Sequence, residues 1–123
     1  MLSRDAILEA DDLARERVAV PEWGKPPDDF VFVRGLTGAE RDAFEQSKYV
    51  RVPDSDDLEL SLKNLRARLA VLSVCDEAGK RLFADDDAAL LGGKNAVALA
   101  RIYEVAARLS GLTVEAREAD SKN

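Results

Sequence analysis

The chain of 123 residues contains no histidine and only one cysteine, Cys75. Without histidine there is no imidazole to activate a serine or cysteine nucleophile, and none to bind zinc. A single cysteine cannot form an intramolecular disulfide bond. No catalytic spacing of other residue types is recognisable either. The sequence therefore predicts a binding protein rather than an enzyme, with no catalytic residues, no cofactor and no metal site.

Long apolar segments are missing as well. The first residues lack the apolar stretch of a signal peptide, and no segment is long enough to span a membrane. Cys75 ends the apolar run of residues 71–75, where a free thiol behaves as a small hydrophobic side chain. We expect a buried structural cysteine and a protein that acts in the cytoplasm, away from membranes.

Basic residues are the minority among the charges. The chain has 24 acidic and 18 basic residues, a net charge of −6. Nucleic-acid binding depends on neutralising phosphates with lysine and arginine, so this balance disfavours a nucleic-acid partner. It favours a soluble protein with an acidic exterior.

The remaining composition is that of a folded protein, with 46% hydrophobic and 34% charged residues. The length suits one domain over residues 1–123. Ser3 can cap a short helix over residues 4–10. Alternating apolar residues on either side of a loop rich in proline and glycine predict a β-hairpin over about residues 17–34.

Helical patterns dominate after the hairpin. Thr37 and Glu40 form a capping box for a helix over about residues 38–49. A leucine every three or four positions predicts a second helix over about residues 57–75. The leucines of this stripe are Leu58, Leu62, Leu65, Leu69 and Leu72.

Two further helices complete the prediction. Asp85 can cap a short helix over about residues 86–91, which Gly92 and Gly93 end. A longer helix is expected over about residues 94–110, with Gly111 at its C-terminus, before a tail over residues 113–123 that holds a weakly apolar helix at 114–119. The predicted fold is α+β and predominantly α, with an N-terminal hairpin packed on a small bundle of amphipathic helices.

Several short patterns resemble functional motifs without meeting their requirements. The sequence Gly92-Gly93-Lys94 lacks the spacing and the serine or threonine of a phosphate-binding loop. The acidic runs at residues 54–57 and 85–87 lack the alternating carboxylates and central glycine of a calcium loop. Helix ends and helix caps are the favoured interpretations. A metal-dependent hydrolase that uses these aspartates is the least supported alternative.

Candidate partner-binding residues come from apolar positions that the predicted core does not use. Leu60, Val71 and Val105 lie at the margins of the two longest apolar stripes, so we expect a partner groove beside the helices predicted at 57–75 and 94–110. The leucine stripe is too short for a convincing coiled coil. Trp23, in the hairpin loop, either anchors a partner or covers the end of the core.

Five segments, taken in order, carry a family resemblance. They are residues 20–24 (Val-Pro-Glu-Trp-Gly), 31–45, 64–69 (Asn-Leu-Arg-Ala-Arg-Leu), 76–83 (Asp-Glu-Ala-Gly-Lys-Arg-Leu-Phe) and 109–113 (Leu-Ser-Gly-Leu-Thr). In this order and spacing the chain resembles the tail assembly chaperones of long-tailed, siphovirus-type bacteriophages and related prophages, over about residues 1–120.

The resemblance implies a function without chemistry. Such chaperones coat the tape measure protein, keep it soluble, and help tail tube protein assemble around it in the host cytoplasm. They are absent from the mature virion. Family members often have a longer form made by ribosomal frameshifting, and Ser121-Lys122-Asn123 can be encoded by a slippery sequence, although an ordinary polar tail is the alternative. A homo-oligomer is a further expectation.

A structural virion component is the alternative function. A tail-completion or head–tail connector protein would share the size, acidity and lack of catalytic residues of this chain. The two functions differ in one observable respect, because a structural subunit remains in the purified particle and a chaperone does not.

Overall fold

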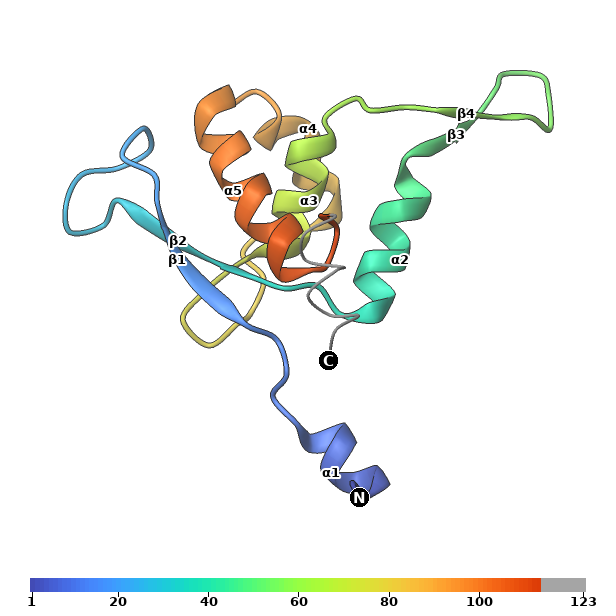
Figure 1. Cartoon of the computed structure of the whole chain (residues 1–123). Helices are drawn as coiled ribbons and strands as arrows, with labels where there is room; N and C mark the ends of the chain where they lie inside the picture. The colour runs from blue at the N-terminus through green and yellow to red at the C-terminus, as the bar shows by residue number, and fades with distance from the viewer. Residues whose placement is uncertain (114–123) are drawn as a thin grey trace.

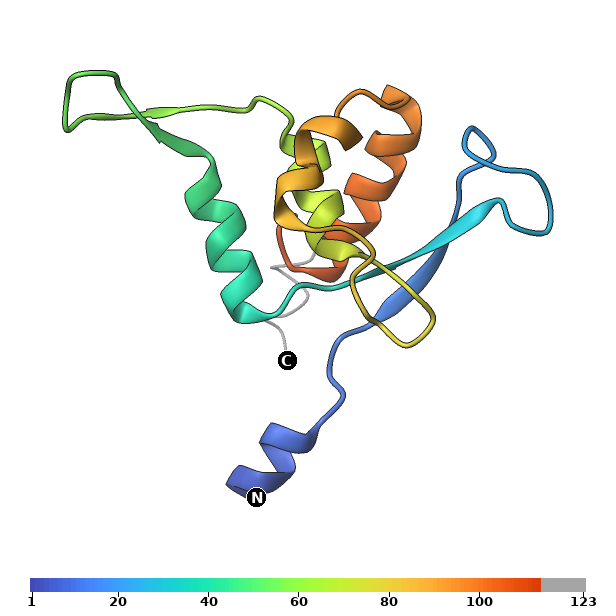
Figure 2. The ribbon, with the colours of Figure 1, turned by 180° about the vertical axis from the view of Figure 1, so that it is seen from behind.

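The computed structural model describes residues 1–113, which form helices around a small antiparallel sheet (Figures 1 and 2). The chain is α+β and predominantly α, as the sequence predicts. In order, the elements are α1 (Arg4–Glu9), β1 (Arg15–Ala19), β2 (Phe30–Arg34), α2 (Gly38–Ser47), β3 (Tyr49–Arg51), β4 (Leu58–Leu60), α3 (Leu65–Ser73), β5 (Val74–Cys75), a 3₁₀ turn η1 (Asp85–Asp87), α4 (Ala88–Leu91) and α5 (Ala96–Leu109). The tail predicted over residues 114–123, with its helix and its possible frameshift site, lies outside the described residues.

The predicted N-terminal hairpin is confirmed. Strands β1 and β2 pair antiparallel with Val18 opposite Val31, and β5 extends the sheet on the other side of β2, giving the order β1-β2-β5. Helix α5 packs against both β1 and β2, and α3 packs against α5. This packing covers the sheet that a hairpin alone could not stabilise in water.

The core lies between the sheet and the helices α2, α3 and α5. Its largest fully buried side chains are Phe44, Leu69 and Ile102, one from each helix, together with Val33 and Val74 of the sheet. Cys75 is also buried, as predicted, and burial raises the pKa of its thiol.

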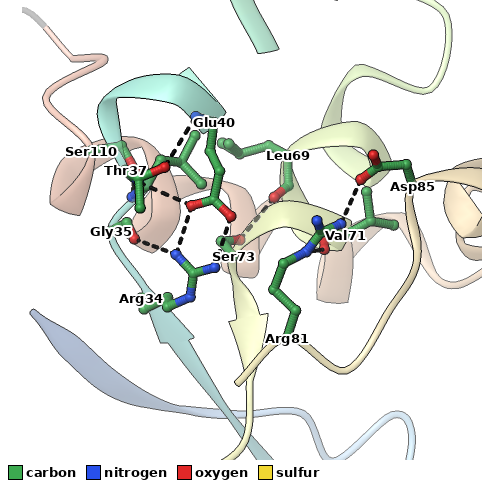
Figure 3. Close-up of polar contacts among 11 residues, drawn as sticks. Arg34, Gly35, Thr37, Glu40, Leu69, Val71, Ser73, Arg81, Asp85 and Ser110 are labelled. Atoms are coloured by element: carbon green, nitrogen blue, oxygen red, sulfur yellow. Dashed lines mark hydrogen bonds and ion pairs between the residues drawn. The ribbon is translucent and has the colours of Figure 1, made fainter. Parts of the chain in front are cut away.

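A largely buried ion pair connects the sheet to α2, with the Arg34 side chain 8% and the Glu40 side chain 19% exposed. Arg34, the last residue of β2, donates from Nη1 to Glu40 Oε1 at 2.8 Å and from Nη2 to Glu40 Oε2 at 2.9 Å (Figure 3). Glu40 also accepts a hydrogen bond from the Thr37 amide, while the Thr37 hydroxyl accepts from the Glu40 amide. The predicted capping box is therefore present, and its carboxylate has a second role in docking α2 against the sheet.

The C-terminal end of α5 contacts the segment that joins β2 to α2, and it also contacts α2 itself. The Leu36 amide donates to Ser110 Oγ, and the Arg41 guanidinium donates to the Ser110 carbonyl. The backbone between β2 and α2 approaches α5 so closely that a Cβ on Gly35 would lie 2.8 Å from the Leu109 carbonyl oxygen. Only glycine fits at this position without a shift of the backbone.

The helix predicted over residues 57–75 is wrong in its first part and in its last two residues, which form β5 and pair with β2. Residues 58–60 form strand β4, and α3 begins only at Leu65, so Leu58, Leu60 and Leu62 are not helical. Asn64 has a φ of 54°, in the left-handed region, which separates α3 from the preceding strand. The acidic run at residues 54–57 lies in the β3–β4 turn rather than at a helix start.

Other boundaries differ by a few residues. Helix α2 ends at Ser47 because Tyr49 pairs in β3, and α5 begins at Ala96 because Asn95 caps it by accepting from the Val97 and Ala98 amides. At the short helix, Asp87 rather than Asp85 accepts from the Ala84 amide. Asp85 instead accepts from Arg81.

The Arg34–Glu40 pair predicts a pH-dependent stability. The Arg34 guanidinium lowers the pKa of Glu40 from 4.5 to about 2. As the pH falls below 4.5, the unfolded chain takes up this proton before the folded chain does, so the stability that the pair contributes decreases between pH 4.5 and about 2. We expect Glu40→Gln to lower the free energy of unfolding by about 3 kcal/mol at pH 7 in denaturant titrations. This difference should shrink as the pH falls through that range.

Glu45→Gln is the matched control for this substitution. Glu45 is on the same helix and pairs with Lys48, but its side chain is 41% exposed. An exposed pair contributes less than about 1 kcal/mol. Equal losses of stability in the two variants at pH 7 would contradict the assignment of the buried pair.

Candidate partner-binding surface

The strands β3 and β4 form a hairpin that extends away from the rest of the molecule, here called the projecting hairpin (residues 48–61). Figure 1 shows it at the upper right, beyond the end of α2. Its register places Tyr49 opposite Leu60 and Arg51 opposite Leu58. Since alternate residues of a strand share a face, three apolar side chains, those of Tyr49, Leu58 and Leu60, gather on one face together with Arg51, and Val50 and Glu59 lie on the other.

The apolar face of the projecting hairpin is not covered by the described part of the chain. Tyr49 is 56% exposed, Leu58 67% and Leu60 60%. A two-stranded hairpin is at best marginally stable alone in water, and an uncovered apolar face makes contact with a partner favourable. This face is the first part of the candidate surface.

Arg68 of α3 holds the root of the projecting hairpin. Its Nη1 donates to the Ser47 carbonyl and hydroxyl, just before β3, and its Nη2 donates to the Ser61 carbonyl at 2.9 Å, just after β4. The Ser61 amide donates to the Lys48 carbonyl at 2.6 Å and completes the root. One guanidinium therefore fixes both ends of the hairpin to the same helix.

A groove between α2 and α3 adjoins this root. Its cavity measures about 220 Å³, below the size of ordinary small-molecule sites. The lining residues are Ala43, Phe44, Ser47, Arg68, Val71, Leu72 and Asp85. Most of these side chains are apolar, so the groove suits one large apolar side chain of a partner better than a cofactor.

Arg81 determines the polar rim of the groove. Its Nε donates to the Val71 carbonyl at 2.9 Å, and its Nη2 donates to Asp85 at 2.7 Å (Figure 3). The ion pair holds Asp85 beside the groove, so a carboxylate joins Ser47 and Arg68 as the polar part of its lining.

The four residues proposed from the sequence do not form one site. Leu60 lies on the projecting hairpin, and Val71, which is 3% exposed, lines the groove. Val105 is half-buried in α5 and packs against the core. A pocket does lie between α3 and α5, but none of these four residues lines it, and Leu60 is separated from it because the segment carrying Leu60 is a strand.

Trp23 is also separate from this surface. It lies in the β1–β2 loop, which extends on the opposite side of the molecule from the projecting hairpin (Figures 1 and 2). The ring packs against the core, and its Nε1 is buried without a hydrogen-bond partner among residues 1–113. This packing favours the core-covering interpretation, and a partner contact through its half-exposed ring stays a prediction.

Sequence reasoning missed two of the three exposed apolar residues on the apolar face of the projecting hairpin. Tyr49 was placed at the end of a helix, and Leu58 was assigned to a leucine stripe. A signal for the hairpin exists in the strict alternation Leu58-Glu59-Leu60-Ser61-Leu62, together with the turn-forming Pro53-Asp54 before it. The same leucines also satisfy a helical period, which favours the helix that the sequence analysis predicts.

Within residues 1–113, no group of three or more histidine, cysteine, aspartate or glutamate side chains is arranged to hold a metal ion. None of the helices over the same residues is long and apolar enough to cross a membrane.

The Arg68 contacts predict that one substitution will loosen the projecting hairpin. Arg68→Ala removes donors to both ends of the hairpin, and hydrogen bonds to charged groups contribute about 1.5–3 kcal/mol each. We expect faster amide hydrogen exchange at Ser61 and through β3 and β4. Arg51→Ala, which removes an exposed ion pair with Asp56 at the hairpin tip, is the control and should change exchange little. Unchanged protection in Arg68→Ala would contradict the assigned role.

No protein-family model, curated protein or solved structure matches the chain, so comparison with known proteins assigns no family or function to it.

Proposed function

We propose that the protein is a non-enzymatic tail assembly chaperone of a long-tailed bacteriophage or prophage. It binds the tape measure protein in the host cytoplasm, keeps it soluble and promotes assembly of tail tube protein around it. The observation that carries this proposal is the uncovered apolar face of the projecting hairpin beside the α2–α3 groove. The family resemblance of the sequence supplies the identity of the partner.

The shape of the surface supports a helical partner. A helix presents apolar side chains at every third or fourth position, along one face. The face formed by Tyr49, Leu58 and Leu60 offers a flat apolar contact to such a stripe. The groove next to Arg68 offers space for one anchoring side chain. A tape measure protein, as a long and largely helical chain, presents many such stripes.

The charges of the projecting hairpin support a chaperone that is stable before it meets its partner. Asp54, Asp56 and Asp57 lie in its turn, and Glu59 lies on its second face. Charged side chains on and near exposed strands prevent edge-to-edge aggregation. The apolar face can therefore remain uncovered until a partner with a complementary stripe arrives.

Co-expression with the tape measure protein of the neighbouring gene tests the proposal. The native chain should keep the tape measure protein in the soluble fraction. The variant Tyr49→Asp/Leu60→Asp should leave it insoluble, because two carboxylates on the apolar face would be desolvated on binding. Both positions are exposed, so the variant should keep the circular dichroism spectrum and melting temperature of the native chain.

Leu82→Asp is the control, because Leu82 is 54% exposed but lies outside both the projecting hairpin and the groove. It should solubilise the tape measure protein as well as the native chain does. Val71 is unsuitable for the test, since a charge at this buried position would unfold the protein. Presence of the chain in purified virions at a fixed copy number would contradict the chaperone proposal and favour a structural tail component.

A further inference from the structure

Helix α1 is an apolar element without a partner in the described chain. All side chains of residues 1–12 are exposed, including Leu2 (71%), Ile7 (55%) and Leu8 (66%). Figures 1 and 2 both show α1 extending away from the other elements. An isolated helix of this length is unstable in water, so a contact surface elsewhere must stabilise it if it is to persist.

The segment around α1 is also strongly acidic. Residues 1–14 carry Asp5, Glu9, Asp11 and Asp12, against the single basic side chain of Arg4. A surface that receives this segment should therefore combine apolar space with uncompensated positive charge. Such a surface is uncommon on a chain whose net charge is −6.

One pocket has this combination of properties. The α3–α5 pocket measures about 200 Å³ and lies where the N-terminal ends of α3 and α5 meet. It is lined by Leu62, Asn64, Leu65, Arg66, Ala67, Gly92, Lys94, Ala96 and Leu99. The lining includes two basic side chains and no carboxylate.

The basic residues of the α3–α5 pocket are available to a ligand. Arg66 and Lys94 are both exposed, and neither has a carboxylate within ion-pair distance among residues 1–113. The Arg66 guanidinium instead lies 5.8 Å from the centre of the Tyr103 ring. By contrast, Arg101 and Arg108 of α5 are each paired with a glutamate.

We propose that α1 of one copy docks in the α3–α5 pocket of a second copy, with Ile7 and Leu8 in the apolar space and the neighbouring carboxylates against Arg66 and Lys94. This inference rests on the proposed function, for which it supplies the contact between successive chaperone copies. The ligand of the pocket is thus an acidic amphipathic helix from the same protein.

The pocket of the same chain is a poor alternative for α1. Strand β1 begins beside the C-terminal end of α5, where Glu16 pairs with Arg108. The distance along α5 from Arg108 to Ala96 is about 18 Å. The linker of residues 10–14 spans at most about 18 Å when fully extended, and it would also have to pass around the helix. A second copy can supply its pocket without this constraint.

Docking of this kind connects two different surfaces, and it closes a dimer only where two copies exchange their α1 helices reciprocally. Where each copy instead donates α1 to the next, the first copy keeps an empty pocket and the last copy keeps an unpaired α1. Such heterologous contacts produce rows or rings of copies. A row of chaperones is the assembly that a long tape measure protein would need.

Sedimentation of the purified full chain over a range of concentrations tests the inference. The native chain should show an average mass that rises with concentration above the monomer mass of 13.4 kDa. Ile7→Asp/Leu8→Asp and Arg66→Glu/Lys94→Glu should each remain monomeric with unchanged melting temperature, because all four positions are exposed. Leu82→Asp, again the control, should associate like the native chain. Association that persists in either double variant, or a native chain that stays monomeric at every concentration, would overturn the inference.

Mixing the two double variants identifies the type of contact. The Ile7/Leu8 variant keeps an intact pocket, and the Arg66/Lys94 variant keeps an intact α1. Together they should form a species of twice the monomer mass and nothing larger. Failure of the mixture to form this species would overturn head-to-tail docking.

The two proposals fail separately. A chain that stays monomeric but solubilises the tape measure protein would overturn the docking of α1 and leave the proposed function standing. A chain that associates through α1 but does not solubilise the tape measure protein would overturn the proposed function alone.

Discussion

The pairing of Arg34 with Glu40 is the interaction on which the arrangement of sheet and helices depends. The two side chains come from the end of β2 and the first turn of α2, so the ion pair sets where the strand stops and where the helix begins. Glu40 has this position because it also closes the capping box with Thr37. Helix initiation and helix docking therefore use one carboxylate, and a buried charge that lost its partner would be costly.

The position of α2 in turn determines the surface available to a partner. With α2 fixed at its start, its end at Ser47 meets Arg68 of α3, which holds the projecting hairpin. The groove between the two helices is mostly apolar, and its lining includes the buried side chains of Phe44 from α2 and Val71 from α3. The candidate surface is thus a product of two arginines, one that docks α2 and one that holds the hairpin.

Short sequence patterns correctly predicted those parts of the fold that depend on residues close together in the chain. The Thr37–Glu40 capping box, the alternation around Val18 and Val31, and the break at Gly92 each act within a few residues, and each is present in the structure. The segment around Leu58–Leu60 was assigned incorrectly because its leucines fit both periods. Hydrogen bonds from Arg68 to residues distant in the sequence help select the strand. The candidate site could likewise be predicted only in part. The sequence points to Leu60 and Val71 as partner-binding residues, but it does not show that they lie on different elements. That separation follows from the contacts of Arg68 with the projecting hairpin.

The separation of the apolar surfaces has a consequence for affinity. The projecting hairpin uses Tyr49, Leu58 and Leu60, whereas the α3–α5 pocket uses a different set of side chains, so occupation of one leaves the other accessible. With both proposed contacts made, each copy would be multivalent even though each of its surfaces is small. Each contact with a long repetitive partner would be weak, but the binding free energies of neighbouring contacts would add through effective concentration. The coat as a whole would then bind tightly, while any single copy could still dissociate and rebind quickly.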